Sequence, residues 1–393
     1  MRGPVPVLAV VGTRPDAVKM APVVKALQQD PDFRPVLVAT AQHREMLDQV
    51  LRLFDLKPDV DLDVMRPRQT LAEVTTRTLE GLDRVLARTR PALVLVQGDA
   101  APCFCGALAA YYHRIPVGHV EAGLRTRDKY RPFPEELYRR MTAALADLHF
   151  APTPWARDNL LREGCDPSSI YVTGNTVIDA LHAIGPRVRP DGLPELDPRK
   201  RLLLVTAHRR ENWGEPLRNV CEAIRDLVLR FPDVEVVFPV HRNPAVREVV
   251  IPALEGVPRV HLLDPPDYGP FVYLERRAYL ILTDSGGVQE EAPGLGTPVL
   301  VLRDTTERPE GVAAGVVRLV GTDRKRVVAE AARLLEDPEA YRSMAAATNP
   351  YGDGRAAWRI VQILRVYFGL SDELPEPFQP ANPQAPVRVD GLG

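Results

Sequence analysis

The sequence predicts an α/β protein made of two similar domains, each a parallel β-sheet covered by helices. Its 393 residues exceed what one ordinary domain core needs, so two domains are expected. Short runs rich in β-branched residues alternate with amphipathic stretches, which is typical of parallel strands joined by crossover helices. A segment rich in proline and glycine, residues 185–200, interrupts this alternation, which then restarts.

The first half, residues 1–184, is predicted to form one Rossmann-like domain. Its buried strands are expected at Val5–Val11, 35–40, 92–96 and Val117–Val120. The helices between them carry apolar residues three to four positions apart and are expected at 16–28, Leu71–Thr89 and 101–113. The repeating unit is a strand, a helix and a second parallel strand, and its crossover connection is expected to be right-handed.

The second half repeats this organisation after a linker at residues 185–200. Strands are expected at 202–206, Val234–Pro239, 279–283 and 299–302, with a helix at 216–230, so the second Rossmann-like domain spans 201–353. Two such domains bind ligands in the cleft between them, at the carboxyl ends of their strands. The proline-rich residues 369–393 cannot build a core and are expected to form a mobile tail.

Composition restricts the kind of ligand. The formal net charge is −2, with 45% hydrophobic and 26% charged residues, so no basic excess is available for a nucleic acid polymer and small anionic ligands fit better. No apolar run reaches the length of a membrane span, and the run at Val5–Val11 is too short for a secretory signal. The four cysteines show no zinc spacing, which predicts reduced thiols in a cytoplasmic protein.

The turn after the first predicted strand is a candidate anion site. Gly12 permits close approach of the backbone, and the helix that follows carries Arg14 and Lys19 in its first turns. Backbone N–H groups at a helix N-terminus attract a phosphate or diphosphate, and the two cations add to this attraction. The alternative is an ordinary strand-to-helix turn with solvated charges.

A second candidate anion site lies where residues 282–287 lead into a helix. Ser285 is expected to cap this helix, while the backbone amides of Ser285, Gly286 and Gly287 face a diphosphate. Glu291 is about one and a half turns further on, where a carboxylate can accept ribose hydroxyls. Arg308, in a loop after a buried strand, is expected to pair with a phosphate or to hold a carboxylate in place. An ordinary capped helix and a surface salt bridge are the alternatives.

Three acids of the first domain, Asp99, Glu121 and Glu135, are predicted to share one cleft because strand ends converge. Acids close to a bound diphosphate suit proton transfer better than binding. Each could instead be a helix cap or a surface acid. His208 follows a strand of the second domain and is expected to hydrogen-bond a leaving diphosphate, whereas the lone His241 is more typical of a structural histidine.

Taken together, a series of strings resembles the non-hydrolysing UDP-N-acetylglucosamine 2-epimerases of bacteria over residues 5 to 368. The strings are GTRPDAVKMAPV, QHREMLDQVL, VGHVEAGLRT, FPEE, GNTVIDAL, TAHRREN, PVHRNP, TDSGGVQEEAP and DTTERPEG. The resemblance implies a glycosyltransferase-B-like pair of Rossmann domains, whose last helix, 354–368, crosses back to the first domain. It also implies neither a metal nor a nicotinamide cofactor.

The resemblance implies a reaction in which a base removes the proton at C2 and UDP leaves C1 to give 2-acetamidoglucal. Reprotonation on the opposite face and return of UDP complete the epimerisation. Matched positions give catalytic roles to Asp99, Glu121, Glu135 and His208. Nucleotide-sugar contacts match Arg14, Lys19, Phe271, Ser285, Gly286, Gly287, Glu291 and Arg308. A second UDP-N-acetylglucosamine as activator matches Gln42, Arg68, Arg209 and His241, and a homodimer is the common assembly of the family.

Several positions depart from the family pattern. Ala100 ends a string usually read as HGDT, here QGDA, and Tyr138 stands where asparagine is common. Pro266 replaces a frequent glutamine, and Glu45 stands where some relatives have glutamine. These departures bear on which UDP-acetamido sugar is accepted and on activation. A hydrolysing epimerase, a glycosyltransferase on the same scaffold and a catalytically silent nucleotide-sugar sensor are the competing hypotheses.

Overall fold

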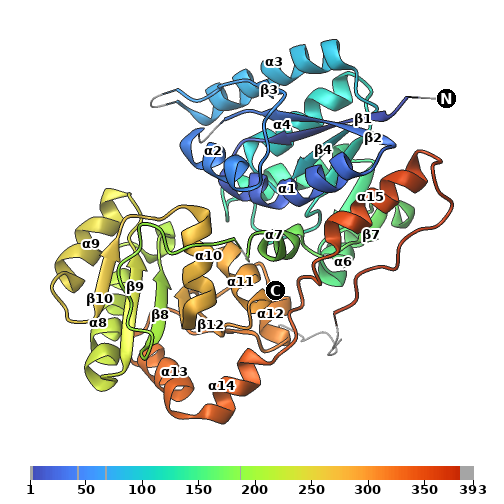
Figure 1. The fold of residues 1–393 in the computed structure, drawn as a ribbon. Helices are drawn as coiled ribbons and strands as arrows, with labels where there is room; N and C mark the ends of the chain where they lie inside the picture. The colour runs from blue at the N-terminus through green and yellow to red at the C-terminus, as the bar shows by residue number, and fades with distance from the viewer. Residues whose placement is uncertain (1–2, 42–43, 67–68, 186, 381–393) are drawn as a thin grey trace. The chain divides into compact units, whose positions relative to one another are not determined.

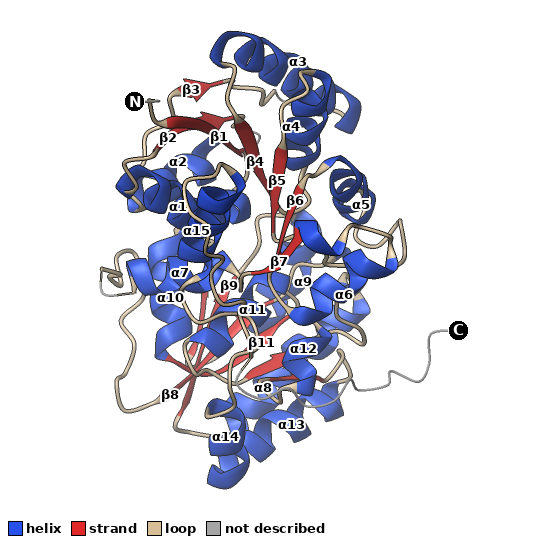
Figure 2. Cartoon of the chain, turned by 90° about the vertical axis from the view of Figure 1, so that its right-hand side faces the viewer, coloured by secondary structure: helices blue, strands red, loops and turns tan. Residues whose placement is uncertain are grey.

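The computed structural model describes residues 3–41, 44–66, 69–185 and 187–380. The chain forms two compact units. Unit 1 contains residues up to Ile184 together with Tyr351–Gln379, and unit 2 contains Gly185–Pro350. Both units consist of a parallel sheet with helices on its faces, as the red strands and blue helices of Figure 2 show, and this confirms the predicted α/β class.

The sheet of unit 1 has the strand order of a Rossmann fold. Within the described residues the order is β3-β2-β1-β4-β5-β6-β7, and every neighbouring pair is parallel. The direction of winding reverses between β1 and β4, which is where α/β sheets bind ligands. The strands are β1 (Val5–Val11), β2 (Phe33–Ala39), β3 (Val60–Asp61), β4 (Leu93–Gln97), β5 (Val117–Val120), β6 (Leu148–Ala151) and β7 (Ile170–Val172).

Two groups of helices cover this sheet. One group contains α3 (Leu71–Thr89), α4 (Ala101–Tyr112) and α5 (Glu135–Leu145), which contact one another in sequence order. The other contains α1 (Arg14–Gln29), α2 (Arg44–Leu53), α7 (Thr176–Ile184) and α15 (Ala356–Tyr367), while α6 (Pro154–Arg162) packs on β6 and β7. Figure 1 shows α15, in red, beside the blue α1, although more than 300 residues separate them in the sequence.

The sheet of unit 2 repeats the Rossmann order, β10-β9-β8-β11-β12-β13, within the described residues. Its winding reverses between β8 and β11. The strands are β8 (Arg201–Thr206), β9 (Val234–Pro239), β10 (Val260–Leu263), β11 (Ala278–Thr283), β12 (Val299–Val301) and β13 (Val317–Leu319). The helices are α8 (Glu215–Arg230), α9 (Pro244–Leu254), α10 (Tyr268–Arg277), α11 (Gly286–Gly294), α12 (Pro309–Ala313), α13 (Arg324–Glu336) and α14 (Pro338–Ala345).

The chain returns to unit 1 slightly earlier than the sequence suggests, and part of the expected tail is packed there. The carbonyl of Tyr351 accepts the N–H of Asn175 at 2.7 Å, which places residue 351 in unit 1 rather than in the second domain. Phe378 is 4% exposed, and its N–H donates to the carbonyl of Val172 on the edge strand β7 at 2.8 Å. Arg359 lies over the Phe378 ring, 5.8 Å from its centroid. Phe378 therefore packs at this end of the sheet.

Candidate active site

Asp99 lies just after β4, beside the point where the winding of the first sheet reverses. The turn before it is held by two buried donors, since the carbonyl of Gly98 accepts from Cys103 Sγ at 3.2 Å and from His119 Nε2 at 2.8 Å. The Asp99 carboxylate is ion-paired with Arg139 of α5, whose side chain is 6% exposed. A cation in contact with a carboxylate favours its charged form. Asp99 is therefore both fixed in position and favoured as an anion.

Glu121 follows the neighbouring strand β5 and has an unusual backbone. Its φ of 65° lies in the left-handed region, which residues with a side chain seldom adopt and which recurs at functional sites. The carboxylate pairs with Lys19 of α1, and Asn175 Nδ2 donates to Oε2 at 3.0 Å. A Cβ placed on Gly98 would lie 3.8 Å from Glu121 Oε1, so the turn carrying Asp99 adjoins this side chain. The structure thus brings these two predicted acids together.

The turn between β1 and α1 differs from the anion site expected there. The Asp16 carboxylate already accepts the N–H groups of Gly12 (2.9 Å), Thr13 (2.6 Å) and Ala17 (2.9 Å). Burial raises the pKa of Asp16 to about 6, although the hydrogen bonds from Thr13 and the amides act in the opposite direction. These amides are therefore engaged by the protein itself. Arg14 begins α1 and is partly exposed, so it stays a candidate contact for a substrate.

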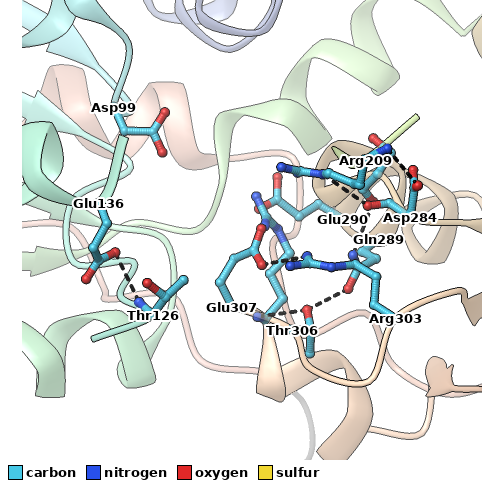
Figure 3. A network of polar contacts seen from close by, with 12 residues as sticks. Asp99, Thr126, Glu136, Arg209, Asp284, Gln289, Glu290, Arg303, Thr306 and Glu307 are labelled. Carbon is cyan, nitrogen blue, oxygen red and sulfur yellow. Dashed lines mark hydrogen bonds and ion pairs between the residues drawn. The ribbon is translucent and has the colours of Figure 1, made fainter. Parts of the chain in front are cut away.

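The start of α5 connects the acids to the loop that follows Glu121. Glu135 is the first residue of α5 and lies one helical turn from Arg139, on the same face. Glu136 is fully buried; it accepts the N–H groups of Thr126 and Arg127, each at 3.1 Å, and a bond from Arg139 at 3.3 Å. Figure 3 shows Glu136 turned toward Thr126. Arg139 consequently joins Glu136 to Asp99.

In unit 2 the buried carboxylate of Asp284 organises the loop after β8. It accepts the backbone N–H groups of His208 and Arg209, each at 2.9 Å, and Asn212 Nδ2 at 2.9 Å. His208 Nδ1 lies 3.3 Å from Asp284 Oδ1, and its ring stacks on that of His241 with centroids 5.5 Å apart. Figure 3 shows Asp284 and Arg209 in contact. The loop after β8, which carries His208, is therefore held by Asp284, which follows β11. The winding of this sheet reverses between these two strands.

Ser285 stands at the N-cap of α11 but does not cap it as expected. Its side chain makes no capping hydrogen bond, and its own N–H is taken by Thr283 Oγ1 at 2.9 Å. The first amides of α11 therefore have no capping bond from Ser285. A Cβ on Gly286 would lie 2.6 Å from Arg308 Nη1, so only glycine allows this arginine to lie against the helix start.

Arg308 is held rigidly by two glutamates. Its Nε donates to Glu290 and its Nη1 to Glu307, each at 2.6 Å, and Glu307 also accepts from Arg303 at 2.8 Å. Burial raises the pKa of Glu307, but the charges of Arg308, Arg303 and Arg209 outweigh this and hold it well below its usual range. Figure 3 shows Glu307 and Arg303 in this network. A fixed, buried guanidinium beside a helix N-terminus suits binding of a diphosphate.

The other predicted residues of unit 2 lie along α10 and α11. Glu291 is buried on α11 and accepts from Tyr268 Oη at 3.3 Å, while Phe271 of α10 packs against the apolar core of the unit. Gln42 and Arg68 lie outside the described residues.

Within the described part of the chain, no group of three or more histidine, cysteine, aspartate or glutamate side chains could hold a metal ion. None of the helices among these same residues is long and apolar enough to cross a membrane.

Comparison with known proteins identifies the family. The family model for UDP-N-acetylglucosamine 2-epimerase matches residues 25–365. The chain belongs to the UDP-N-acetylglucosamine 2-epimerase family. The Bacillus subtilis UDP-N-acetylglucosamine 2-epimerase is 54% identical over 376 residues, which cover 95% of this chain and 98% of that protein.

Solved structures agree with this membership of the epimerase family. The UDP-GlcNAc 2-epimerase from Neisseria meningitidis, bound to UDP-GlcNAc, matches with a TM-score of 0.86 at 48% identity, covering 91% of this chain and 99% of that one. The glycosyltransferase of kitacinnamycin matches with a TM-score of 0.61 at 14% identity, covering 92% of this chain and 99% of that one, and so shares the fold alone. The predicted glycosyltransferase-B-like fold is thereby confirmed.

Three residues that sequence reasoning did not single out hold the candidate residues of the two units in place. Arg139 pairs with Asp99, Asn175 donates to Glu121, and Asp284 holds the loop of His208. Asp284 directly follows a strand, so the rule that located the other acids could have found it. Arg139 lies within α5, where its spacing alone does not distinguish it from a surface residue, and Asn175 lies in the short loop between β7 and α7.

Proposed function

We propose that the protein catalyses the reversible epimerisation of UDP-N-acetylglucosamine at C2, giving UDP-N-acetylmannosamine without release of the sugar. The observation that carries this proposal is the pair of carboxylates, Asp99 and Glu121, at the ends of the adjacent strands β4 and β5. Each is held by a buried cation. Proton transfer at one carbon from two faces requires two such groups. Membership of the epimerase family supports the same reaction.

In the proposed reaction one carboxylate removes the proton from C2 while the C1–O bond to UDP breaks. The electron pair of the C2–H bond becomes the C1–C2 double bond of 2-acetamidoglucal, and UDP leaves with the electron pair of the C1–O bond. A second acid then protonates C2 from the opposite face, and the UDP oxygen returns to C1. Asp99 and Glu121 are assigned to these two steps, with Glu135 as a third acid close by.

The groups of unit 2 are assigned to the nucleotide. The amides of Gly286 and Gly287 and the guanidinium of Arg308 would bind the diphosphate, and His208 would hydrogen-bond the leaving oxygen. Glu291 is suited to accept ribose hydroxyls. Ser285, Phe271 and, from unit 1, Arg14 and Lys19 complete the proposed contacts. Positive charge that is already in place stabilises departing UDP without rearrangement during the reaction.

The deciding experiment is incubation with UDP-N-acetylglucosamine in deuterated water, followed by NMR at C2. Deuterium should enter C2 of both epimers while UDP stays attached. Turnover should be lost in Asp99→Asn and Glu121→Gln and kept in Glu80→Gln, which changes an exposed acid on α3. Epimer formation without deuterium at C2 would contradict elimination, and accumulation of unattached sugar would indicate a hydrolysing epimerase.

A second UDP-N-acetylglucosamine is proposed as an activator. Arg209 is adjacent to His208 in the sequence, and the His241 ring is stacked on the His208 ring. Both neighbours of His208 support an effect of a bound activator on catalysis. Full rate from UDP-N-acetylmannosamine without added UDP-N-acetylglucosamine would contradict this activation.

A homodimer and a cytoplasmic location are proposed on the basis of the family resemblance and the reduced cysteines. Sedimentation measurements and cell fractionation test them.

A further inference from the structure

A cavity rich in arginine lies in unit 1, and none of its lining residues is assigned to the nucleotide. It has a volume of about 280 Å³ and lies between α5, α6 and the loop 124–127. Its lining includes the guanidinium groups of Arg125, Arg127, Arg140 and Arg162 and the carboxylates of Glu136 and Glu163. The volume is close to the lower end of the range for small-molecule sites, which begins at about 300 Å³.

The two carboxylates in the lining are engaged by the protein. Glu163 is bonded by Arg125 through both oxygens, at 2.9 and 2.7 Å, and the Arg125 side chain is 3% exposed. Glu136 is buried beneath the two backbone N–H groups of the loop and the guanidinium of Arg139. Glu136 is fully buried, and the charge of Glu163, whose side chain is 31% exposed, is balanced by Arg125.

The remaining arginines leave the cavity positive. Arg140 Nε is 3.6 Å from Glu163, beyond hydrogen-bond distance, and its side chain is 48% exposed. Arg162 donates through Nη1 to the neutral amide oxygen of Asn159 at 3.0 Å. Among the described residues, the Arg127 guanidinium has no ion pair. Burial raises the pKa of Glu163, but the hydrogen bond from Arg125 and the charges of Arg125 and Arg140 outweigh it, so the pKa is lowered.

We propose that this cavity binds a phosphate group, as inorganic phosphate or as the end of a small phosphomonoester, through Arg127, Arg140 and Arg162. Guanidinium groups match phosphate oxygens with paired hydrogen bonds, and three of them around one concavity favour a doubly charged anion. The site is built by a single unit. It is also distinct from the start of α11, where the diphosphate of the substrate is proposed to bind.

The bound anion acts on the acids of the same unit through a continuous series of contacts. The backbone N–H of Arg127 donates to Glu136, Glu136 accepts from Arg139, and Arg139 pairs with Asp99. An anion that fixes the Arg127 side chain also fixes this loop, and with it the position of Arg139. Phosphate is therefore expected to change the rate of turnover. This second part rests on the proposed function.

The test is calorimetric titration of the full chain with inorganic phosphate and with ribose 5-phosphate at constant ionic strength. Arg162→Gln should weaken binding about 10- to 100-fold, since a charged hydrogen bond is lost. Arg157→Gln is the matched control, because it removes the same charge from an exposed position of α6 outside the cavity. Tighter binding of ribose 5-phosphate would identify a phosphomonoester as the ligand, and equal binding would identify the phosphate group alone. Equal affinity in both variants, or no binding, would overturn the site.

The link to Asp99 is measured separately as turnover with and without saturating phosphate. The rate should change in the unmodified chain and in Arg157→Gln but not in Arg162→Gln. An unchanged rate in a chain that binds phosphate would overturn the link. Failure of the proposed function would appear instead as no turnover before phosphate is added, and the calorimetric result would still decide the binding site.

Discussion

Single residues fix the charge and the position of the candidate acids in different ways. Asp99 is held by Arg139, and the turn before it is fixed by the two buried donors to the Gly98 carbonyl. Glu121 is held by Lys19 and by the left-handed backbone that aims its side chain. The acid that removes a proton from carbon must begin as an anion, whereas the acid that protonates the opposite face must begin protonated. The cations are therefore expected to matter as much as the acids.

Arg139→Gln tests this expectation for Asp99. Loss of a charged hydrogen bond of about 1.5–3 kcal/mol should lower kcat by about 10- to 150-fold. The acid limb of the rate profile should move to higher pH, because the carboxylate loses the cation that favours its ionised form. Arg139→Lys keeps the charge and should recover part of the rate. Arg84→Gln, an exposed change on α3, is the control. A lower rate with an unmoved pH profile would contradict the charge effect.

His119→Gln tests the group that fixes the turn before Asp99. Burial lowers the pKa of His119 from 6.5 to about 3, so below pH 6.5 this histidine is protonated in the unfolded chain but stays neutral in the folded chain. Its contribution therefore lowers the free energy of unfolding as pH falls from 6.5, by about 2 kcal/mol at pH 5. Amide exchange of β4 and β5 at pH 7.5 and 5.0 measures this loss. It should be smaller in the variant, and an equal loss in both proteins would contradict the assignment.

At the scale of elements, α4 begins without a capping side chain. Its N-cap is Ala100, with extended φ and ψ of −76° and 166°, and no side-chain bond is made there. This position follows Asp99 directly. In the family pattern that the sequence resembles, the string HGDT places a threonine here. Backbone N–H groups in the first turn of a helix need acceptors, which an alanine methyl group does not supply.

Ala100→Thr is expected to stabilise unit 1. A hydroxyl at an N-cap contributes about 1 kcal/mol, which corresponds to a rise in Tm of about 2–4 °C for a domain of this size. Ala100→Val is the matched control, because it has nearly the shape of threonine but no hydroxyl. Calorimetric melting of both variants decides the question. Equal Tm values for the two would show that the helix start is satisfied in another way.

Long elements are well defined by the sequence, although the short strands β5 and β12 were located as well. The strand at Val5–Val11 and the helix at Leu71–Thr89 were predicted with their observed bounds, because several turns or alternations define them. The strands β7 and β13 have three residues each, too few for a period to show. The packing of Phe378 on β7 depends on a contact across about 200 residues of sequence, which local pattern does not encode.

For the whole molecule, the sequence predicted two Rossmann-like halves, and each described unit has the Rossmann strand order. Asp99, Glu121 and His208 were located as residues that follow strands, since this rule depends only on topology. Their partners Arg139, on a helix, and Asn175, in the loop before α7, were missed because tertiary packing decides which side chains face the acids. Proton transfer is thus assigned to unit 1, and most of the nucleotide contacts are assigned to unit 2.

This division predicts that the two tasks can be separated by mutation. Arg308→Lys should weaken UDP binding about 10-fold or more, because a lysine cannot reproduce the fork of the guanidinium, while its charge still faces Glu290 and Glu307. Asp99→Asn should leave UDP affinity within about twofold yet abolish turnover, since UDP carries no sugar for this acid to act on. Calorimetry with UDP and NMR of epimer formation measure the two properties. If Asp99→Asn weakened UDP binding as much as Arg308→Lys, the nucleotide would depend on the acids of unit 1, and the separation of tasks would be wrong.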